Sequence, residues 1–359
     1  MKVEKLHIDR IRNLRDIEIS PSEGVNVIYG ENGQGKTNLL EAIWLFTGAK
    51  SFRAAKDSEF IPFFENWAEL SLELKAVHED SRLTLRYGEK KEITHNGCKL
   101  LDMRELAGVF EAVVFSPVHL SLITGNPSER RKTIDTVIGQ IKPRYISVIL
   151  EYQRLLMQRN TLLKDITFSS ALMDTLDVWD TSLARCGSLI SRIRQSYIDK
   201  LSIPMVEIYD DITSSKENIE ISYQSSVGDV EISEELFRSR LLQERGNDIR
   251  LGVTSIGPHR DDVEIKVNKT LARTYASQGQ QRSAVLAMKL GECAIMQEVT
   301  GEKPVVLLDD VMSELDDSRR DFLLNRLRDR QIFITCCDPR QVTEVERKYL
   351  IKDGRLIGD

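Results

Sequence analysis

Residues 30–38 read GENGQGKTN, and this stretch decides how the rest of the chain is interpreted. Residues 30–37 match the phosphate-binding pattern G-x-x-x-x-G-K-[ST] at every fixed position. The glycines let backbone N–H groups turn inward around a phosphate, Lys36 reaches the β- and γ-oxygens, and Thr37 supplies a hydroxyl for Mg²⁺. A glycine-rich turn that arose by chance is the alternative interpretation.

The flanking sequence predicts a strand before this loop and a helix after it. Residues 25–30 read VNVIYG, a short apolar run typical of a buried strand, and in 36–46, KTNLLEAIWLF, apolar residues recur at helical spacing. A strand–loop–helix order is the setting in which such a loop binds a nucleotide. We therefore expect ATP to be bound by Gly30, Glu31, Asn32, Gly33, Gln34, Gly35, Lys36, Thr37 and Asn38.

A second motif, PVVLLDDVMSELD at 304–316, ends an apolar strand in two carboxylates. Such a strand places Asp309 at the carboxyl edge of a parallel sheet beside the loop, where it would hold Mg²⁺ together with Thr37. Asp310 would orient or deprotonate the attacking water, so Lys36 and Asp310 are the predicted catalytic residues. A strand-end turn followed by an acidic helix start is the other interpretation of the two aspartates.

A third stretch, ASQGQQRS at 276–283, opens a predicted helix. Ser277 is a good N-cap, and a glycine in the first turn leaves backbone N–H groups bare at the positive end of the helix. This second anion site is in the wrong place to serve the same loop, so we expect it to face the γ-phosphate of a second copy. The predicted contacts are Ser277, Gln278, Gly279 and Gln280. An ordinary capped helix explains the serine but not the glutamines.

The remaining patterns predict one α/β domain with a helical insertion. Alternating runs indicate a small antiparallel layer, with a hairpin turn at Asn96-Gly97, and from 263 onward strands and helices alternate, which is typical of a parallel sheet. From about 127 to 245 the pattern is mostly helical, with a strand at 219–225. We expect residues 1–117 and 253–359 to form the ATPase lobe and residues 118–252 the insertion.

Composition limits the class of protein. Apolar residues make up 41% and charged residues 30%, a soluble globular balance, and no apolar run approaches the length of a membrane span. The five cysteines form no CxxC pair, which favours a reducing cytoplasm over a disulfide framework. The net charge is −6, but basic residues are in local excess between 130 and 200, where a solvated helix face is the alternative to a nucleic-acid surface.

Together these motifs resemble a known family. The order GENGQGKT, SQGQQR, LLDDVMSELD is similar to the ABC-type ATPase head of the SMC-like group, and several stretches resemble the RecF family. These are IRNLRDIEI at 11–19, the loop with its helix and the SFR turn at 30–53, GNPSERRKTID at 125–135, and IGPHRDD at 256–262. The resemblance runs from about residue 3 to the C-terminus and is weakest across 136–250. It implies an α/β ABC-type P-loop ATPase head with an antiparallel β layer and a mainly helical second lobe.

The resemblance also implies a function. RecF-like proteins are ATPases that use ATP and Mg²⁺ and form ATP-dependent dimers on single-stranded, double-stranded and junction DNA. They act with RecR and RecO, and through them RecA, in recombinational DNA repair, DNA replication and the SOS response in the cytoplasm. It implies a D-loop at Ser313, Glu314, Leu315 and Asp316. The candidates for DNA contact are Arg53, Arg130, Arg131 and Arg260. For Arg53 the alternatives are a contact with a phosphate and a plain surface position. For the other three the alternative is a contact between the lobes, and for Arg260 also an ion pair with a neighbouring aspartate.

Some positions depart from the family pattern. Val118 and His119 stand where RecF proteins usually carry an acidic residue, and Thr335 and Cys336 stand where an ABC ATPase has its switch histidine. No glutamine can be placed as the Q-loop. A short base without the histidine predicts slow hydrolysis. The alternative function is a nucleotide-gated structural ATPase of the SMC-like group without DNA contact. An ABC transporter subunit would keep the histidine, and a long-armed SMC protein would need sustained heptads.

Overall fold

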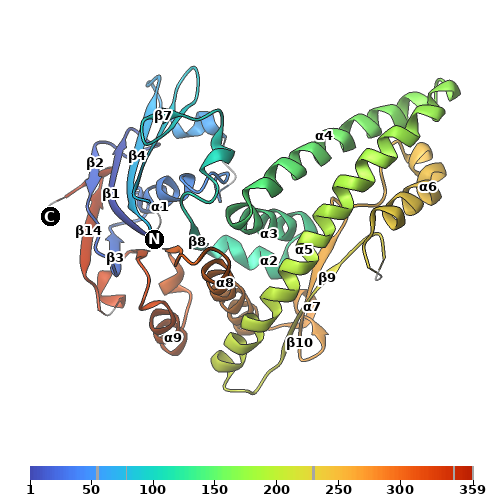
Figure 1. The fold of residues 1–359 in the computed structure, drawn as a ribbon. Helices are drawn as coiled ribbons and strands as arrows, with labels where there is room; N and C mark the ends of the chain where they lie inside the picture. Colours follow the sequence, from blue (N-terminus) through green and yellow to red (C-terminus); the bar gives the residue numbers. More distant parts are fainter. Residues whose placement is uncertain (54–55, 78, 229–230, 343, 358–359) are drawn as a thin grey trace. The chain divides into compact units, whose positions relative to one another are not determined.

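The computed structural model describes residues 1–359 except 54–55, 78, 229–230, 343 and 358–359, and Figure 1 shows its helices and strands. The chain forms two compact units: unit 1 consists of residues 1–120 and 282–359, and unit 2 of residues 121–281. Unit 2 begins close to residue 118 but extends well past residue 252, the expected end of the insertion. The reason is that β10 (Asp262–Val267) pairs with β9 (Ile219–Gln224), which lies in the same unit.

The parallel sheet of unit 1 carries the phosphate-binding loop. Its strand order is β15-β14-β3-β13-β12-β8, and every neighbouring pair is parallel except β14 with β15. The carboxyl ends of parallel strands meet at one edge, so the ends of β3, β13 and β12 lie together, as the sequence predicts. The strands are β3 (Val25–Tyr29), β8 (Ala112–Phe115), β12 (Val305–Asp309), β13 (Ile332–Cys336), β14 (Arg347–Lys352) and β15 (Arg355–Leu356).

An antiparallel sheet forms the second layer of unit 1, in the order β2-β1-β4-β5-β6-β7. The predicted hairpin is confirmed: Asn96 and Gly97 both have positive φ, 50° and 80°, in the turn between β6 and β7. Strand β2 begins only at Ile17, because a bridge from Ile11 to Leu14 closes a turn before it. The strands are β1 (Lys2–Asp9), β2 (Ile17–Ile19), β4 (Ala68–Lys75), β5 (Ser81–Tyr87), β6 (Glu92–His95) and β7 (Cys98–Lys99).

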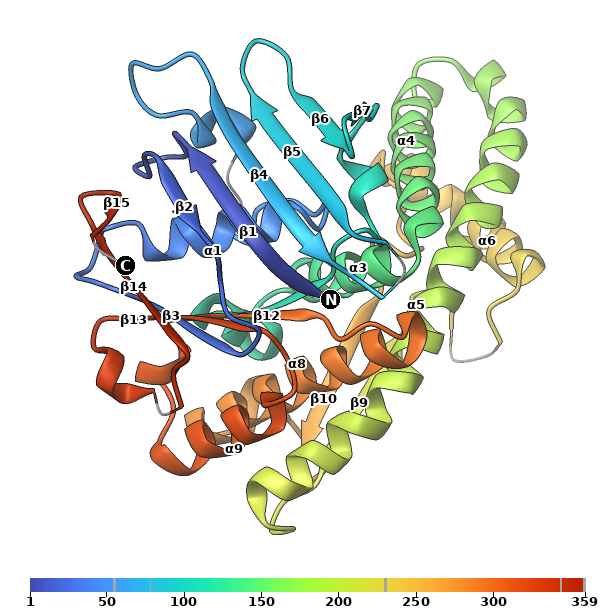
Figure 2. The same ribbon diagram turned by 60° about the vertical axis from the view of Figure 1, so that its left-hand side comes forward.

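Helix α1 (Lys36–Leu45) follows the loop and packs against both sheets in one apolar core (Figure 2). Nearly all of its side chains are buried, including Trp44, so its sequence lacks a polar face. The other helices of unit 1 are most of α8 (Gln278–Thr300), α9 (Asp317–Leu327) and the short η1 (Asp57–Phe60), η2 (Met103–Leu106), η3 (Pro117–Leu120), η5 (Val311–Ser313) and η6 (Pro339–Gln341).

Unit 2 is mainly helical, as expected. In Figure 1 the two longest helices, α4 and α5, form a hairpin, and a three-stranded antiparallel sheet, β11-β10-β9, completes the unit. Within the described residues, no helix combines the length and the apolarity needed to cross a bilayer. The remaining elements are α2 (Ser121–Thr124), α3 (Pro127–Ile141), α4 (Pro143–Ile166), η4 (Ser170–Thr175), α5 (Leu176–Thr213), α6 (Glu234–Leu251), α7 (Ala272–Tyr275) and β11 (Thr270–Leu271).

The core of unit 2 contains a buried arginine that joins three helices. Arg159 of α4 is fully buried and donates to Asp180 of α5 at 2.7 Å and to Asp248 of α6 at 2.8 Å. It also donates to the hydroxyl of Thr254 at 2.8 Å, at the start of the turn that leads to β10. Charge-assisted hydrogen bonds of this kind hold the helices in one register, provided that every charge keeps its partner.

Candidate nucleotide site

The loop between β3 and α1 has the backbone of a phosphate cradle. Gly30 has φ 151°, and a Cβ atom there would lie 2.3 Å from the carbonyl oxygen of Ile351. Gly35, the N-cap of α1, has φ 113°, and a Cβ there would meet Leu14 at 2.6 Å. Glycine is therefore required at both positions. The first N–H groups of α1 have no acceptor inside the helix and are available to an anion.

The ammonium group of Lys36 lies inside the curve of this loop. Lys36 is only 5% exposed, and its Nζ donates to the carbonyl oxygens of Gly30 at 2.7 Å and Glu31 at 2.9 Å. The thiol of Cys337 lies 3.7 Å from the same Nζ and 3.2 Å from Oδ1 of Asn32. A phosphate that enters the loop would replace these neutral acceptors with charged oxygens, which bind an ammonium group more strongly.

The two candidate metal ligands are in direct contact. Thr37 Oγ1 donates to Asp309 Oδ1 at 2.8 Å, across a separation of 272 residues in the sequence. Burial raises the pKa of Asp309, and the hydrogen bonds from Thr37 and Thr335 oppose that shift. A hydroxyl and a carboxylate so close together form the oxygen set that Mg²⁺ prefers. The residues present therefore fit the predicted metal.

Thr335 belongs to this cluster, although the sequence analysis identified it only as a residue that stands where an ABC ATPase has its switch histidine. Its hydroxyl donates to Asp309 Oδ1 at 2.9 Å and accepts from the backbone N–H of Asp310 at 2.9 Å. Thr335 is fully buried at the end of β13, next to the end of β12. The sequence could have indicated this role, because Thr335 ends the apolar stretch QIFIT at 331–335. A hydroxyl at the carboxyl end of a parallel strand lies at the same sheet edge as the two carboxylates that follow β12.

Asp310 stands at a sharp turn after β12. Its φ is 54°, in the left-handed region, and its carbonyl oxygen accepts from Ser313 Oγ at 2.9 Å. For a residue other than glycine this conformation costs on the order of 1–2 kcal/mol, and such strain is concentrated at functional sites. The side chain is half-buried, so a water molecule can reach it. Its role as the base remains a prediction.

The predicted D-loop residues divide into two pairs. Ser313 and Asp316 are exposed, although Asp316 also caps α9 by accepting from the N–H of Arg319 at 3.0 Å. Leu315 is buried in unit 1, and Glu314 lies 3.8 Å from Arg282. Ser313 and Asp316 are therefore the two positions that a second chain can reach most readily.

The SQGQ stretch lies in unit 2 and forms a reciprocal capping box at the start of α8. The N–H of Gln280 donates to Ser277 Oγ at 3.3 Å, and the N–H of Ser277 donates to Gln280 Oε1 at 2.8 Å. The predicted N-cap role of Ser277 is confirmed. Ser277 and Gln278 are exposed, and Gly279 is half-buried, so the helix end is open to a ligand.

Arg53 lies beside the phosphate loop. Its Nη1 donates to Asn38 Oδ1 at 2.7 Å, Asn38 donates to Asn13 Oδ1 at 2.7 Å, and Asn13 donates to the carbonyl oxygen of Gly33 at 3.2 Å. This chain of polar side chains links the SFR turn to the loop. Arg53 is exposed, and its charge also acts on the pKa of Asp309 in the lowering direction.

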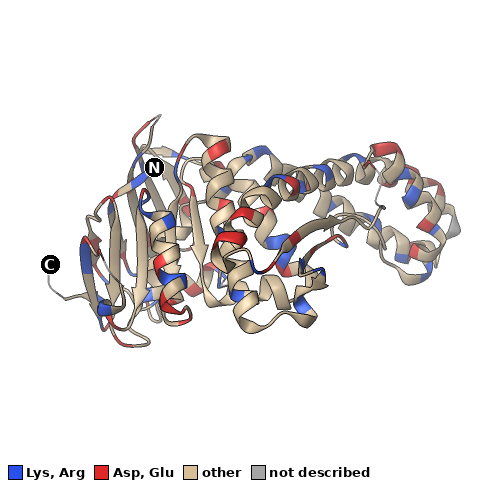
Figure 3. Ribbon diagram, turned by 90° about the horizontal axis from the view of Figure 1, so that it is seen from below, with Lys and Arg blue, Asp and Glu red and all other residues tan. Residues whose placement is uncertain are grey.

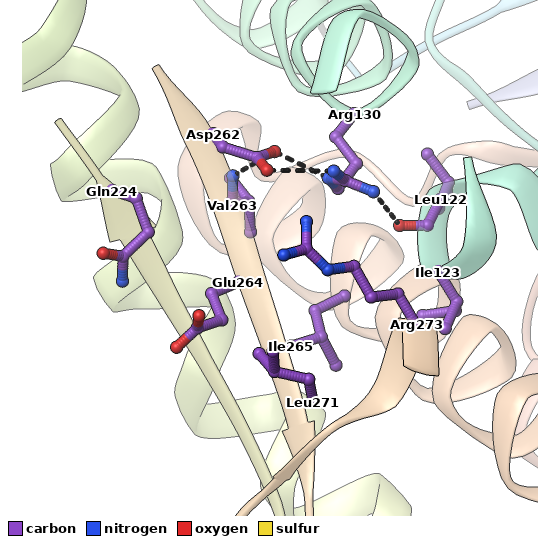
Figure 4. Close-up of a pocket in the computed structure, with 10 residues that line it drawn as sticks. All are labelled: Leu122, Ile123, Arg130, Gln224, Asp262, Val263, Glu264, Ile265, Leu271 and Arg273. Carbon is purple, nitrogen blue, oxygen red and sulfur yellow. Dashed lines mark hydrogen bonds and ion pairs between the residues drawn. The ribbon is translucent and has the colours of Figure 1, made fainter. Parts of the chain in front are cut away.

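The three arginine candidates of unit 2 differ in exposure. Arg130 is 4% exposed, and its Nε and Nη2 donate to the carboxylate of Asp262 at 2.7 and 2.9 Å. Both residues line a cavity of about 150 Å³ (Figure 4). Arg131 is half-buried and donates to the carbonyl oxygen of Asp261 at 2.7 Å, whereas Arg260 is exposed. Arg130 thus holds the fold of unit 2 and is not free to contact DNA.

The suggested ion pair between Arg260 and a neighbouring aspartate is not formed among the described residues. Asp262 is engaged by Arg130, and Asp261 accepts from the hydroxyls of Ser191 and Ser226. In the part of the chain that the structure describes, the guanidinium of Arg260 makes one long contact, 3.4 Å, from Nη2 to the carbonyl oxygen of Thr254. Figure 3 shows basic and acidic positions interspersed along the helices of unit 2, which fits the solvated-face interpretation of the local basic excess.

His119 and Cys336, two of the residues that depart from the family pattern, are both buried in the structure. His119 is 8% exposed, and its Nδ1 accepts from the N–H of Ser116 at 3.1 Å, while burial holds its pKa well below the usual value. A neutral histidine is therefore fixed in η3, beside an exposed Val118. Cys336 is buried in β13, and burial raises the pKa of its thiol to about 11.

Comparison with known sequences gives consistent matches. Residues 2–355 match the family model described as the RecF/RecN/SMC N terminal domain. The chain is 37% identical to the DNA replication and repair protein RecF of Lachnospira eligens, over 100% of both chains. It is 40% identical to the protein of that name from Clostridium acetobutylicum, over 98% of this chain and 96% of the other.

Solved structures agree with these matches. The recombination mediator protein RecF-ATPrS of the RecFOR pathway superposes with a TM-score of 0.93 at 39% identity, over 99% of this chain and 97% of that one. The corresponding RecF-ATP structure gives a TM-score of 0.92 at 38% identity, over 99% and 96%. The Smc head domain of Pyrococcus furiosus gives a TM-score of 0.55 at 16% identity, over 99% and 95%, a likeness of fold alone.

Proposed function

The chain belongs to the RecF family of DNA replication and repair proteins, and from this premise we propose that it is an ATP-dependent clamp that dimerises on DNA. The observation that carries the proposal is the contact between Thr37 and Asp309 beside the buried ammonium group of Lys36. The RecF structures with ATP and with ATPrS, 38% and 39% identical to this chain, support ATP as its nucleotide.

ATP binding follows from the chemistry of unit 1. The N–H groups of residues 30–38 surround the phosphates, Lys36 neutralises the β- and γ-oxygens, and Thr37 with Asp309 holds Mg²⁺. The metal, when bound, neutralises charge that develops on the phosphate oxygens. Asp310 accepts a proton from the attacking water. A short carboxylate base without a switch histidine suits slow hydrolysis, which would serve as a timer for release.

Dimerisation follows from the start of α8. Ser277 Oγ uses a lone pair to accept from Gln280, so its O–H remains free to donate to a phosphate. Together with the N–H groups of Gln278 and Gly279, it offers three donors to the γ-phosphate bound by a second copy, and Ser313 and Asp316 meet that copy from the D-loop. Dimer affinity then depends on the nucleotide, and hydrolysis removes the bridging group and opens the clamp.

DNA binding is the next step of the proposal. The closed dimer brings two copies of exposed basic residues, Arg260 and partly Arg131, to one DNA molecule, while Arg53 stays at the nucleotide. Contacts to phosphates give affinity without sequence readout, so the clamp recognises shape, such as a gap or a junction between single and double strands. RecR and RecO would be recruited there to load RecA, which places the protein in recombinational repair, replication and the SOS response of the cytoplasm.

The test uses the full chain with Mg²⁺ and ATP. Sedimentation velocity measures the dimer, and fluorescence anisotropy measures binding to a gapped duplex. Lys36→Met should abolish both the ATP-dependent dimer and ATP-stimulated DNA binding, because the phosphates lose their ammonium partner. Ser277→Arg should leave ATP binding by the monomer within twofold of wild type, because unit 1 is unchanged, and should block the dimer.

The outcomes separate the alternatives. A dimer that forms without regard to ATP or to Lys36 contradicts the clamp. A dimer that requires ATP but binds gapped duplex no better than the nucleotide-free chain favours the structural ATPase without DNA contact. Loss of monomer ATP affinity in Ser277→Arg means that Ser277 serves its own nucleotide rather than that of a partner.

A further inference from the structure

Glu217 makes a specific contact with the SQGQ stretch. Its Oε1 accepts from Gln280 Nε2 at 2.9 Å, and its Oε2 accepts from the hydroxyl of Tyr209 at 2.7 Å. Tyr209, near the C-terminal end of α5, is fully buried. One carboxylate therefore joins the end of the longest helix of unit 2 to the side chain that caps α8.

The backbone around Glu217 is fixed independently of this contact. Ser214 and Ser215 both adopt left-handed conformations, φ 54° and 57°, where the chain reverses after α5. The N–H of Asn218 donates to Asn268 Oδ1 at 3.0 Å, and the N–H of Asn268 donates back to the carbonyl oxygen of Asn218 at 2.9 Å. The backbone on both sides of Glu217 and the hydrogen bond from Tyr209 therefore hold this carboxylate without any contribution from Gln280.

A carboxylate selects one orientation of the Gln280 amide. An ionised carboxylate only accepts hydrogen bonds, so the NH₂ end of Gln280 must face Glu217. The amide oxygen then faces the N–H of Ser277, where it closes the capping box. Without Glu217 the amide of Gln280 can rotate by 180°, so that its NH₂ group faces the N–H of Ser277. Both groups are hydrogen-bond donors, so no hydrogen bond can form between them.

We infer that Glu217 is a positioning residue for the contact between the start of α8 and the nucleotide of a second copy. By fixing the Gln280 amide it closes the capping box, which holds the Ser277 hydroxyl and the free N–H groups of the first turn in the geometry that a γ-phosphate requires. The inference rests on the proposed function of the SQGQ stretch. Preorganised donors bind an anion more tightly because less ordering remains to be done on binding.

The effect should appear in dimerisation and not in nucleotide binding by the monomer. Loss of a hydrogen bond to a charged group costs about tenfold in affinity, and because a dimer contains two such sites, Glu217→Ala should weaken the ATP-dependent dimer about a hundredfold. Monomer ATP affinity should stay within twofold of wild type, since the phosphate loop lies in unit 1. Loss of a residue that only stabilises the fold would not weaken the dimer while leaving the ATP affinity of the monomer unchanged.

Four variants make the test. Glu217→Ala and Glu217→Met remove the acceptors, the second while keeping the length of the side chain. Glu217→Gln keeps one accepting oxygen for two donors and should lie between Glu217→Ala and wild type. Glu220→Ala removes an exposed carboxylate from β9, three residues away, and is the matched control. Sedimentation gives the dimer constant with ATP, and a fluorescent ATP analogue gives the monomer constant.

The inference is supported if wild type and Glu220→Ala form the tightest ATP-dependent dimers, Glu217→Gln a weaker one, and Glu217→Ala and Glu217→Met the weakest. A dimer of Glu217→Ala within twofold of the control overturns the inference. If Glu217→Ala fails to fold, the same criterion applies to Glu217→Met. Ser277→Arg runs in parallel: if it fails to block the dimer, the proposed function is wrong; if it blocks while the Glu217 variants dimerise normally, only the positioning role is wrong.

Discussion

A single threonine hydroxyl organises the carboxylates of the nucleotide site. Thr335 donates to Asp309 and accepts from the N–H of Asp310, so one oxygen atom fixes the candidate metal ligand and the backbone of the candidate base. ABC ATPases place a histidine in this part of the site. In this chain a hydroxyl, which does not ionise near neutral pH, holds the two aspartates in place.

Thr335→Val should slow ATP hydrolysis without weakening ATP binding. The variant keeps the shape of the side chain but leaves the N–H of Asp310 without its acceptor and Asp309 with one donor fewer. We expect a fall of about tenfold in kcat, the equivalent of about 1.4 kcal/mol for one lost hydrogen bond, with KM nearly unchanged. Steady-state phosphate release measures both constants.

Thr335→Ser is the control, because it keeps the hydroxyl and loses only a methyl group. Its kcat should stay within about threefold of wild type. The interpretation fails if the valine and serine variants are equally active, or if valine raises KM while leaving kcat unchanged.

Among the elements, the three long helices of unit 2 depend on one buried charge. Arg159→Met should destabilise unit 2 by about 3–5 kcal/mol, because Asp248 would remain buried without a cation and Asp180 would keep only its ion pair with Arg245. Arg154→Met, on the exposed face of the same helix, is the matched control and should change stability by less than about 0.5 kcal/mol. Urea unfolding followed by circular dichroism measures the difference. Equal stability of the two variants would show that the cluster contributes nothing.

The elements show what sequence can and cannot predict. The loop, α1 and the position of Asp309 followed from local pattern, because a parallel sheet gathers the ends of its strands at one edge. The burial of Arg130 did not, since its partner Asp262 lies 132 residues away and pairing between distant side chains leaves no local periodicity. The extent of unit 2 depended in the same way on the pairing of β10 with β9, and the role of Thr335 on the neighbour that its strand acquires.

For the molecule as a whole, stability should depend on pH through a buried carboxyl group. Glu111 is 2% exposed, and burial is the main cause that raises its pKa to about 7, with Glu302 adding to the shift. Thr300 donates to Glu111 Oε2 at 3.0 Å and opposes the shift, as does the N-terminal amino group, which pairs with Glu302 at 2.7 Å. The folded state therefore favours the protonated form more than the unfolded state does.

The sign follows from that preference. The contribution of Glu111 is fully present below the ordinary pKa of 4.5 and is lost as the pH rises through about 7, a loss of about 3 kcal/mol for a shift of this size. Glu111→Gln has no such loss, so its stability relative to wild type should increase by about 2–3 kcal/mol between pH 5 and pH 8. Urea unfolding followed by tryptophan fluorescence at each pH measures this. Parallel pH profiles for wild type and Glu111→Gln would contradict it; Glu4→Gln, at an exposed position, is the control.

The position of β3 has a consequence for how the protein is made. Its neighbours in the sheet, β13 and β14, lie about 300 residues later in the chain, and Asn26 already bonds to Ile332 across 306 residues. At a translation rate of about 5–20 residues per second, roughly 15–60 s pass before a ribosome has made those strands. The antiparallel layer, whose strands are close in sequence, can form meanwhile, while β3 waits with both edges open. The phosphate-binding loop that follows β3 therefore cannot be fixed at the edge of its sheet until translation is nearly complete.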